Sequence, residues 1–493
     1  MFLSIFKLYF FPFILSLGFG IGLGYWESLF EFKEFLFFLI GLSINTLFLI
    51  FIQQSHSKLL KQIFIVSIIA FCTYIASSTG FLQGHMSLGI VASIFQTNHS
   101  EAAEFLSGVN YKFIGYSIVL LILTGFYIFK YQTKAKLNFN HKFWYFLLIF
   151  NVFNIFLVQT VKATFLYKKE EQDLLQEFGQ KVDWKVKRVD PKYENQIFII
   201  GESVHRDYLS LYDFKEKTTP FLDKMPLTVI DRYISAAPNT VTSLSRTLAM
   251  ADQKTNDINI AMNVVSLAKQ AKYNTVWLSN QGFMGKNDTP ISKIAIHADQ
   301  QVYLKHGSYQ SKNIDDLELI PLLEESLQKN KHKNNVIFVH MMGSHPQACD
   351  RLFETPKQYN QYPETINCYL SSINKLDSFI EQSYKVLKKQ NKSFSISYFS
   401  DHGMTVTDDS YYVDNDTKSN YTVPFFQLTS DAKRKHYLHK TVSAYDFLNI
   451  YASTLGIETS YLQSSRSLEK IRNNQDVKVF NWDKYLKYNE LRE

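Results

Sequence analysis

The sequence predicts an α/β protein in which five transmembrane helices precede a domain built on a mostly parallel sheet sandwiched by helices. Long apolar segments dominate the chain before residue 168, whereas short apolar, β-rich runs alternate with helical stretches after residue 194. The first pattern is typical of membrane spans, and the second of a parallel sheet covered by helices. The 493 residues suffice for two or three domains. We expect a transmembrane domain over 1–167, a linker over 168–194 and a globular domain over 195–493.

The membrane domain is predicted from hydropathy and loop charge. Each apolar segment approaches the ~20 residues that cross a bilayer, and the segments run roughly over 8–26, 35–53, 62–82, 113–129 and 143–166. The loops on one side hold Lys7, Lys58, Lys61, Lys130, Lys134, Lys136 and Lys142, whereas the other side holds only Lys33 and Lys112. The positive-inside rule places the N-terminus in the cytoplasm, so that everything after residue 167 lies outside. A cleaved signal peptide is disfavoured, because four more spans follow the first.

Charge and cysteine content narrow the classes of function. The net charge of +7 is modest, and no basic stretch is interleaved with aromatic residues, so we expect no nucleic-acid partner. Cys72 lies in an apolar run and is interpreted as a small core residue. Cys349 and Cys368 lie in the polar part of the chain and can pair if that part is exported.

Polar residues follow four of the predicted strands. The runs over 196–200, 274–278, 335–339 and 394–399 lead into Gly201-Glu202-Ser203, Ser279-Asn280-Gln281, His340-Met341-Met342-Gly343-Ser344-His345 and Ser400-Asp401-His402-Gly403. In open α/β sheets, ligands bind outside the carboxyl ends of the strands. Carboxylate and imidazole groups that meet there suit Zn²⁺, which makes Glu202, Asp401, His402, His340 and His345 candidate ligands. The pair Asp401-His402 alone could equally be a capped turn. Glu202 at the end of a second strand makes a metal site the favoured interpretation.

A candidate nucleophile lies in the stretch ISAAPNTVTSLSRTLAM. Pro238-Asn239 predicts a turn before a helix, which places Thr240 at or near the helix N-terminus, a position that favours phosphate. Zinc on the Thr240 hydroxyl would lower its pKa and make it a nucleophile. Two alternatives stay open: Thr240 is only an N-cap, or Thr242 is the nucleophile.

The outside loop over 83–112 contains SIFQTNHSEAAEFL, which predicts an amphipathic helix. Thr97 and Glu101 lie one turn apart on that helix and share a face. The face is either solvated or in contact with substrate.

Several motifs together resemble the bacterial phosphoethanolamine transferases of the alkaline phosphatase/sulfatase superfamily. GESVHRDYLSLYDFKEKTTPFL resembles their GES-x-x-R…TTP stretch, HMMGSHP resembles H-x-x-G-S-H, and SDHG resembles their metal-binding Asp-His. The resemblance covers nearly the whole chain, including the five spans. It implies an alkaline-phosphatase-like domain in the periplasm, anchored in the bacterial inner membrane.

The resemblance also implies roles for individual residues. Glu202, Thr240, Asp401 and His402 match the zinc ligands, with Thr240 as the nucleophile. His345 matches a histidine that holds substrate or a second zinc, His340 lies beside it, and Asn280 is expected among the substrate-binding residues. Thr97 and Glu101 match part of a motif that contacts the phosphoethanolamine head group. Cys349 and Cys368 resemble one of the family's disulfides.

The implied reaction moves phosphoethanolamine from phosphatidylethanolamine to lipopolysaccharide core, lipid A or another envelope glycan through phosphothreonine. The chain departs from lipid A-modifying members, because it has Pro238-Asn239-Thr240 instead of Cys-Gly-Thr around the nucleophile. It also has SNYTVPFF where they carry a His-Gly pair, and Tyr421 or Asn420 is expected to take that place. The alternatives are a phosphoglycerol transferase of the same superfamily and a non-catalytic membrane-anchored binding protein. A sulfatase is disfavoured, because the chain has no Cys-x-Pro-x-Arg motif.

Overall fold

The computed structural model of the protein comprises two compact units, and the chain passes from the first to the second between Lys168 and Lys169. The structure describes residues 2–22, 32–76, 111–132, 137, 141–152, 161, 164–165, 168, 182–282, 290–305, 313–463, 468 and 470–493. Thr97 and Glu101, for which a role in substrate contact is predicted, lie outside the described residues.

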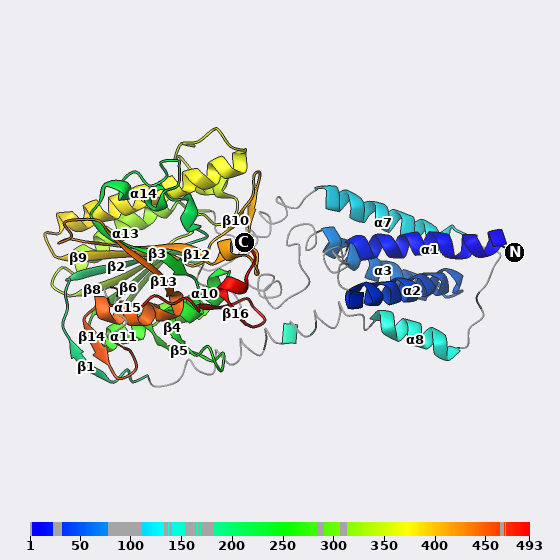
Figure 1. Cartoon of the computed structure of the whole chain (residues 1–493), viewed down its shortest axis with the longest axis horizontal. Helices are drawn as coiled ribbons and strands as arrows, with labels where there is room; N and C mark the ends of the chain where they lie inside the picture. The colour runs from blue at the N-terminus through cyan, green and yellow to red at the C-terminus, as the bar shows by residue number, and fades with distance from the viewer. Residues whose placement is uncertain are drawn as a thin grey trace. The chain divides into compact units, whose positions relative to one another are not determined.

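The described part of the first unit is helical (Figure 1). Its helices are α1 (Phe2–Gly22), α2 (Phe32–Gln54), α3 (Lys58–Tyr74), α7 (Tyr111–Phe129) and α8 (His141–Val152). Each overlaps one of the five segments predicted to span a membrane. By length and composition, one described helix, over Lys112–Phe129, is long and apolar enough to cross a bilayer, and Phe6–Gly22 and Phe38–Gln54 form shorter apolar helices. Five crossings therefore stay a prediction.

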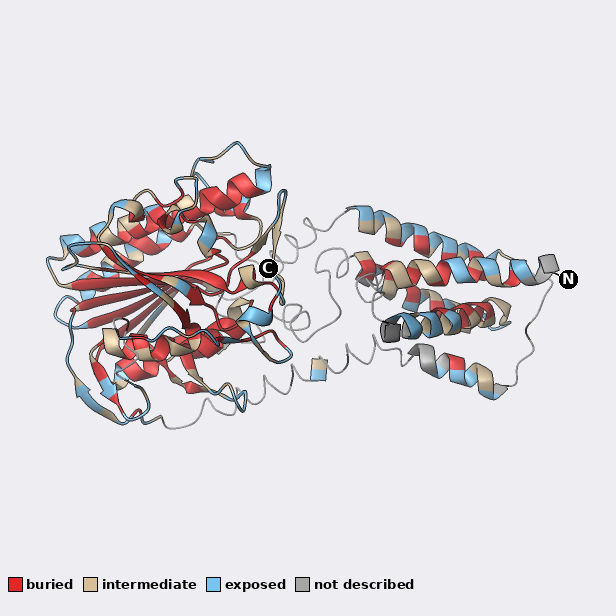
Figure 2. Ribbon diagram, viewed as in Figure 1, coloured by how far each residue is buried: buried red, intermediate tan, exposed pale blue. Residues whose placement is uncertain are grey.

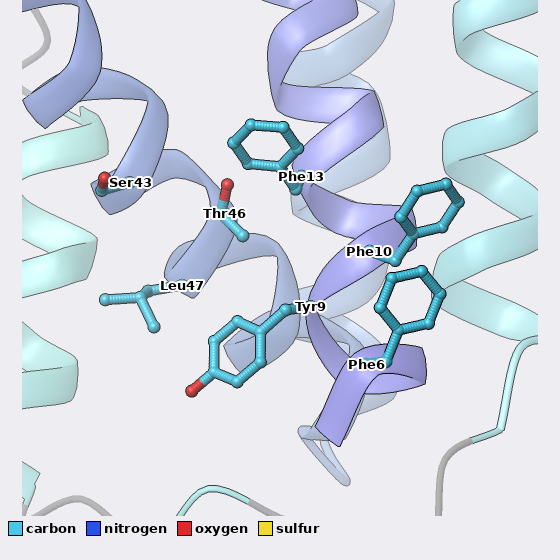
Figure 3. A pocket seen from close by; sticks show the side chains of 7 residues that line it. All are labelled: Phe6, Tyr9, Phe10, Phe13, Ser43, Thr46 and Leu47. Carbon is cyan, nitrogen blue, oxygen red and sulfur yellow. The ribbon is translucent and has the colours of Figure 1, made fainter. Parts of the chain in front are cut away.

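Apolar side chains both fill the first unit and cover its outside. Phe19, Leu49 and Ile52 are buried in its core, while Val66 and Ile122 remain 67% and 63% exposed. An apolar pocket lies between α1 and α2, lined by Phe6, Tyr9, Phe10, Phe13, Ser43, Thr46 and Leu47 (Figure 3). The hydroxyls of Ser43 and Thr46 donate to carbonyls of their own helix, at 2.8 and 2.7 Å. A soluble protein rarely exposes so much apolar surface, whereas a surface that faces lipid requires it.

An eight-stranded sheet forms the centre of the second unit, in the order β13-β3-β12-β9-β2-β8-β6-β7 (Figure 1). Its strands are β13 (His436–Ser443), β3 (Leu227–Ile234), β12 (Thr422–Thr429), β9 (Phe394–Ser400), β2 (Asn195–Gly201), β8 (Asn335–His340), β6 (Asn274–Gly282) and β7 (Gln300–Lys305). Neighbouring strands are parallel, except that β12 runs antiparallel to both β3 and β9. The four strands predicted from the sequence are β2, β6, β8 and β9, and they lie next to one another, so their carboxyl ends share one edge.

Helices cover both faces of this sheet, because its strands are apolar on both sides. Along β2, Ile197 and Ile199 point into one core with α13 (Leu319–Lys329) and α14 (Glu364–Lys389). Phe198 and Ile200 point into the other core. That core is shared with α10 (Thr240–Leu248), α11 (Val264–Gln270), α12 (Pro290–Ala295) and α15 (Phe447–Thr454). The buried strands between these two helical layers are visible in Figure 2. The predicted mostly parallel sheet between helices is confirmed.

The predicted linker over 168–194 is wrong for its last part, because residues from 182 onward belong to the second unit. β1 (Val186–Val189) pairs with β14 (Ile457–Thr459), and Trp184 is fully buried. The Trp184 indole donates to Ser266 Oγ at 2.9 Å. The sequence does not identify this segment as a strand, because most of its residues are charged. In the structure these charged residues point outward from the two-stranded sheet. Three further two-stranded sheets are β4 (Ala249–Ala251) with β5 (Ile258–Asn263), β10 (Thr405–Val406) with β11 (Tyr411–Tyr412), and β15 (Lys478–Phe480) with β16 (Tyr485–Lys487).

Candidate metal centre

Three metal-competent side chains meet at the carboxyl edge of the central strands. Glu202 follows β2, and Asp401 and His402 follow β9, its parallel neighbour. Their ligand atoms all lie within 4.8 Å of one another, and all three residues are buried. His402 Nε2 is 3.3 Å from Glu202 Oε1 and 3.5 Å from Asp401 Oδ2. A second group, Cys349, Glu364 and Cys368, is no rival site, because its two sulfur atoms are joined in a disulfide.

Ser203 and the His402 amide hold one oxygen of each of the Glu202 and Asp401 carboxylates in place. The amides of Ser203 and His402 donate to Asp401 Oδ1 at 3.0 and 2.7 Å, and the Ser203 hydroxyl donates to Glu202 Oε1 at 2.7 Å. Asp401 Oδ2 is buried and has no hydrogen-bond partner among the described residues. A buried carboxylate oxygen without a partner is costly, and a bound cation removes that cost.

His402 presents the nitrogen that a metal needs. Its Nδ1–H donates to the carbonyl oxygen of Gly403 at 2.8 Å, so Nε2 is the atom that faces the two carboxylates. Histidines that bind zinc commonly donate their other ring N–H in this way, which fixes the ring and the tautomer. A metal at Nε2 replaces the proton that this nitrogen shares with the carboxylates in the absence of metal.

The two buried carboxylates of the cluster favour a bound cation. Burial raises the pKa of Glu202, but the hydrogen bond to His402 and the charges of His402 and His345 hold that pKa well below its usual range. Burial and then the charge of Glu202 raise the pKa of Asp401 to about 8. Burial lowers the pKa of His402, but Asp401 and Glu202 raise it to about 9. Two buried carboxylates thus compete for one positive charge, and a divalent cation satisfies both. Two carboxylates and one imidazole nitrogen fit zinc.

Thr240 is the first residue of α10, and its hydroxyl contacts the cluster. Asn239 is the N-cap, and its side chain accepts the Thr242 amide at 3.2 Å. The Thr240 hydroxyl donates to Glu202 Oε2 at 3.0 Å. Thr240 is half-buried, whereas Thr242 is buried. The N-cap role considered for Thr240 therefore belongs to Asn239, and the geometry favours Thr240 over Thr242 as nucleophile.

The loop after β8 packs against the backbone of Glu202. The Ser344 amide donates to the Glu202 carbonyl at 3.0 Å. Gly343 has φ +56°, and a Cβ there would lie 2.9 Å from both the nitrogen and the carbonyl oxygen of Glu202, so only glycine fits. This loop brings His345 close enough to Glu202 to lower the pKa of that carboxyl. His340 ends β8, and its buried Nε2 has no hydrogen-bond partner among the described residues.

Asn280 supports this loop through a residue that the sequence does not single out. The Asn280 amide nitrogen donates to Asp316 Oδ1 at 2.9 Å and to the Ile314 carbonyl at 2.7 Å. Asp316 in turn accepts the amides of Met342 and Gly343, both at 2.8 Å. Burial raises the pKa of the Asp316 carboxyl. The predicted substrate contact of Asn280 can therefore involve only its carbonyl oxygen, since its amide nitrogen holds the loop. Asp316 follows a stretch without motif character, so no sequence signal marks it.

Neither residue expected in place of the family's His-Gly pair offers its polar group. The Tyr421 hydroxyl donates to the Asn415 carbonyl at 2.6 Å, and the ring lies in a small core with Ile234. The Asn420 amide donates to Thr405 and Thr417, both at 2.6 Å, and its oxygen accepts the Asp414 amide at 3.0 Å. Both residues therefore brace the loop that follows Gly403. Cys349 and Cys368 form a disulfide with an S–S distance of 2.12 Å.

The sequence is similar to a family of known enzymes. The profile of the sulfatase family matches residues 194–457, more than half of the chain. A protein of Haemophilus influenzae, provisionally named as a phosphoethanolamine transferase, is 34% identical over 344 residues, which cover 66% of this chain and 70% of that protein. Phosphoethanolamine transferase OpgE of Escherichia coli is 36% identical over 297 residues, which cover 59% of this chain and 56% of OpgE.

Two solved structures share the fold. The periplasmic domain of EptC from Escherichia coli, in complex with Zn, superposes with a TM-score of 0.54 at 22% identity, over 62% of this chain and 96% of that domain. The integral membrane protein EptA from Neisseria meningitidis, a lipooligosaccharide phosphoethanolamine transferase, superposes with a TM-score of 0.64 at 14% identity, over 92% of this chain and 97% of EptA. These likenesses support the fold, including its alkaline-phosphatase-like domain. The family match and the named relatives show that this chain belongs to the sulfatase family as a phosphoethanolamine transferase.

Proposed function

We propose that this enzyme transfers phosphoethanolamine from phosphatidylethanolamine to an envelope glycan, lipopolysaccharide core or lipid A, through a phosphothreonine at Thr240. The observation that carries the proposal is the 3.0 Å hydrogen bond from the Thr240 hydroxyl to Glu202 Oε2, inside a cluster fit for zinc. Glu202, Asp401, His402 and Thr240 would hold the zinc. When bound, zinc lowers the pKa of the threonine hydroxyl and neutralises charge on phosphoryl oxygens.

The protein's own groups account for both steps. In the first, Thr240 Oγ1 bonds to phosphorus and the bond from phosphorus to the diacylglycerol oxygen breaks. Thr240 gives up its hydroxyl proton, the diacylglycerol oxygen takes up a proton, and Glu202 orients the threonine hydroxyl through their hydrogen bond. In the second, an acceptor hydroxyl oxygen bonds to phosphorus and loses its proton, the bond from phosphorus to Thr240 Oγ1 breaks, and Thr240 Oγ1 regains a proton. The N-terminal end of α10, with its helix dipole, favours the phosphoryl group beside Thr240 in both steps.

The comparisons support further parts of the proposal. A zinc complex of EptC and the membrane protein EptA share this fold, which supports zinc and an inner-membrane position for this chain. We propose five crossings, with the second unit in the periplasm. His340, His345 and Asn280 then surround the phosphoryl group, and Thr97 and Glu101 contact the head group.

Replacement of Thr240 tests the proposal. Thr240→Ala should abolish transfer and leave zinc binding and folding measurable, whereas Thr240→Ser should keep activity, because it keeps a hydroxyl at the same place. Purified enzyme is incubated with phosphatidylethanolamine or phosphatidylglycerol, and tryptic peptides that contain residue 240 are weighed by mass spectrometry.

A phosphoethanolamine adduct on Thr240 is expected from the first lipid only. An adduct from phosphatidylglycerol would instead identify a phosphoglycerol transferase. Thr242→Ala is the matched control on the same helix, and loss of the adduct in that variant alone would move the nucleophile.

A further inference from the structure

His402 contacts the Glu202 carboxylate, and His345 follows Ser344, whose amide donates to the Glu202 carbonyl. The Nδ1 atoms of these two histidines have opposite kinds of partner. His402 Nδ1 faces the carbonyl oxygen of Gly403 at 2.8 Å, which can only accept a hydrogen bond. His345 Nδ1 faces Nη2 of Arg351 at 3.5 Å. A guanidinium has donors and no acceptor, and it stays protonated in proteins. His402 therefore carries hydrogen on Nδ1, whereas His345 Nδ1 must accept.

The Arg351 side chain is held firmly in this position. It is 5% exposed, and its Nη1 donates to Asn313 Oδ1 at 2.6 Å. Asn313 is itself fixed, because its amide nitrogen donates to the Asp350 carbonyl at 2.7 Å. Arg351 Nη2 also lies 3.4 Å from the Pro346 carbonyl, next to His345 in the chain. The guanidinium thus bridges the loop of His345 and the segment around Asn313.

The backbone that carries Arg351 is also anchored. Arg351 lies in the short helix η7 (Ala348–Arg351), which the Cys349–Cys368 disulfide ties to α14. Lys375 of α14 donates to the carbonyls of Arg351 and Leu352 at 2.7 and 3.1 Å, and pairs with Asp315 at 2.7 Å. On the other side, the His345 amide donates to the Met342 carbonyl at 3.2 Å. Both partners are therefore positioned before any substrate binds.

We propose that Arg351 is a positioning residue that makes His345 a hydrogen-bond donor to a phosphoryl oxygen, and not a ligand of a second zinc. With Nδ1 accepting from Arg351, the neutral imidazole keeps its hydrogen on Nε2. An Nε2–H donates to an anionic oxygen but has no lone pair for a metal. His402, with the opposite tautomer, keeps its Nε2 lone pair for zinc. The inference rests on the proposed function, and it predicts one zinc ion per chain at this site.

The experiment compares the full-length protein, purified in detergent, with Arg351→Met, Arg351→Lys and His345→Gln. Arg188→Met is the matched control, since Arg188 is an exposed arginine paired with Asp190 in the edge strand β1. Zinc per chain is measured by elemental analysis after equilibration with buffered zinc. The protonated ring nitrogen of His345 is read from ¹⁵N-histidine spectra, with its signal assigned by its loss in His345→Gln. Transfer from phosphatidylethanolamine is measured on the same samples.

The expected wild-type result is one zinc per chain, hydrogen on His345 Nε2, and an unchanged zinc content in His345→Gln. Arg351→Met should move hydrogen toward Nδ1 and slow transfer by ~10²-fold, in the range seen when one donor to a reacting oxygen is lost. Arg351→Lys keeps a donor and should restore the tautomer and much of the rate, which a merely structural role would not do. Arg188→Met should match the wild type.

Other results would overturn the proposal. Two zinc ions in the wild type with one lost in His345→Gln would make His345 a ligand, and an unchanged tautomer in Arg351→Met would leave Arg351 without this role. If Arg351→Met does not fold, the wild-type spectrum and Arg351→Lys decide the same question. These readouts need no turnover, so a failure of phosphoethanolamine transfer, which would reject the proposed function, is distinguishable from a failure of this inference.

Discussion

Ser203 occupies a left-handed backbone conformation, with φ of 60°, between the metal-competent Glu202 and the rest of the turn. Residues other than glycine adopt this conformation at a cost of roughly 1–2 kcal/mol. The surrounding contacts hold it there: its amide donates to Asp401, its hydroxyl donates to Glu202, and its carbonyl accepts the Tyr369 hydroxyl at 3.0 Å. The strained residue thus lies directly beside the proposed zinc ligands, and its hydrogen bonds orient both carboxylates.

Two substitutions separate the strain from the hydrogen bond. Ser203→Ala keeps the strain but removes the hydroxyl that donates to Glu202 Oε1, so we expect a loss of roughly 1–3 kcal/mol in the free energy of unfolding. Ser203→Gly loses the same bond but relieves the backbone, and should be the more stable of the two. Both should weaken zinc binding by roughly 10- to 100-fold, since residues that orient metal ligands have effects of that size. Denaturant unfolding and zinc titration measure these effects. A Ser203→Ala protein as stable as Ser203→Gly would show that the strain is negligible.

At the scale of residues, the sequence predicts the cluster of metal-competent side chains but not the residues that hold the surrounding loops in place. Glu202, Asp401 and His402 can be found because each follows a strongly apolar strand, and such strands place their carboxyl ends together. Asp316 and Arg351 cannot be found in this way. Asp316 binds the Met342 and Gly343 amides of a different loop. Arg351 contacts the nearby His345 and also the distant Asn313, and only the folded chain brings these groups together. The places of Thr97 and Glu101 remain predictions.

At the scale of elements, the central strands are predictable and the edges are not. β2, β6, β8 and β9 are buried on both faces, so each appears in the sequence as a short apolar run. β12 inserts antiparallel between β3 and β9, and no local pattern encodes that order. β1 has two adjacent, exposed charged residues between two valines, and it pairs with only one neighbour, β14. A single tryptophan in a charged stretch, Trp184, was the available signal that this segment folds onto the second unit.

Trp184 is therefore expected to stabilise the second unit although it precedes the sheet. Its ring is fully buried, its indole nitrogen donates to Ser266, and Tyr461 packs edge-on against it with ring centres 6.3 Å apart. Trp184→Ala should lower the free energy of unfolding by about 3–5 kcal/mol, as other large-to-small changes in cores do. Lys187→Ala, an exposed change in the adjacent β1, should alter it by less than about 0.5 kcal/mol. Denaturant unfolding of residues 182–493 measures both, and equal stabilities would restore the linker interpretation.

At the scale of the whole molecule, the chain combines an apolar helical unit with an enzyme unit that has its own two cores. Hydropathy predicts the positions of the five helices well, because an apolar run of sufficient length is a strong signal. It does not determine how many of them cross a bilayer, since α8 is described over only 12 residues. The second unit holds Glu202, Thr240, Asp401 and His402, the residues proposed to bind zinc and to supply the nucleophile.

The first unit should raise the rate at which the enzyme uses a donor lipid that is embedded in a bilayer. A lipid head group in a bilayer is available only at the membrane surface, and tethering an enzyme there gains a factor of ~10²–10⁴ without any new contact. Residues 182–493 should bind zinc like the full chain. They should use a short-chain, water-soluble phosphatidylethanolamine about tenfold more slowly, because they lack Thr97 and Glu101, the proposed contacts of the head group. On phosphatidylethanolamine in vesicles, the full chain reconstituted in the same membrane should be at least ~10²-fold faster. Phosphothreonine formation at Thr240 is measured for both donors, with Thr240→Ala as the blank. Equal rates on vesicles would mean that the first unit does not serve donor access. Equal rates of the two chains on the soluble donor would mean that the part before residue 182, which includes Thr97 and Glu101, does not contribute to recognition of the head group itself.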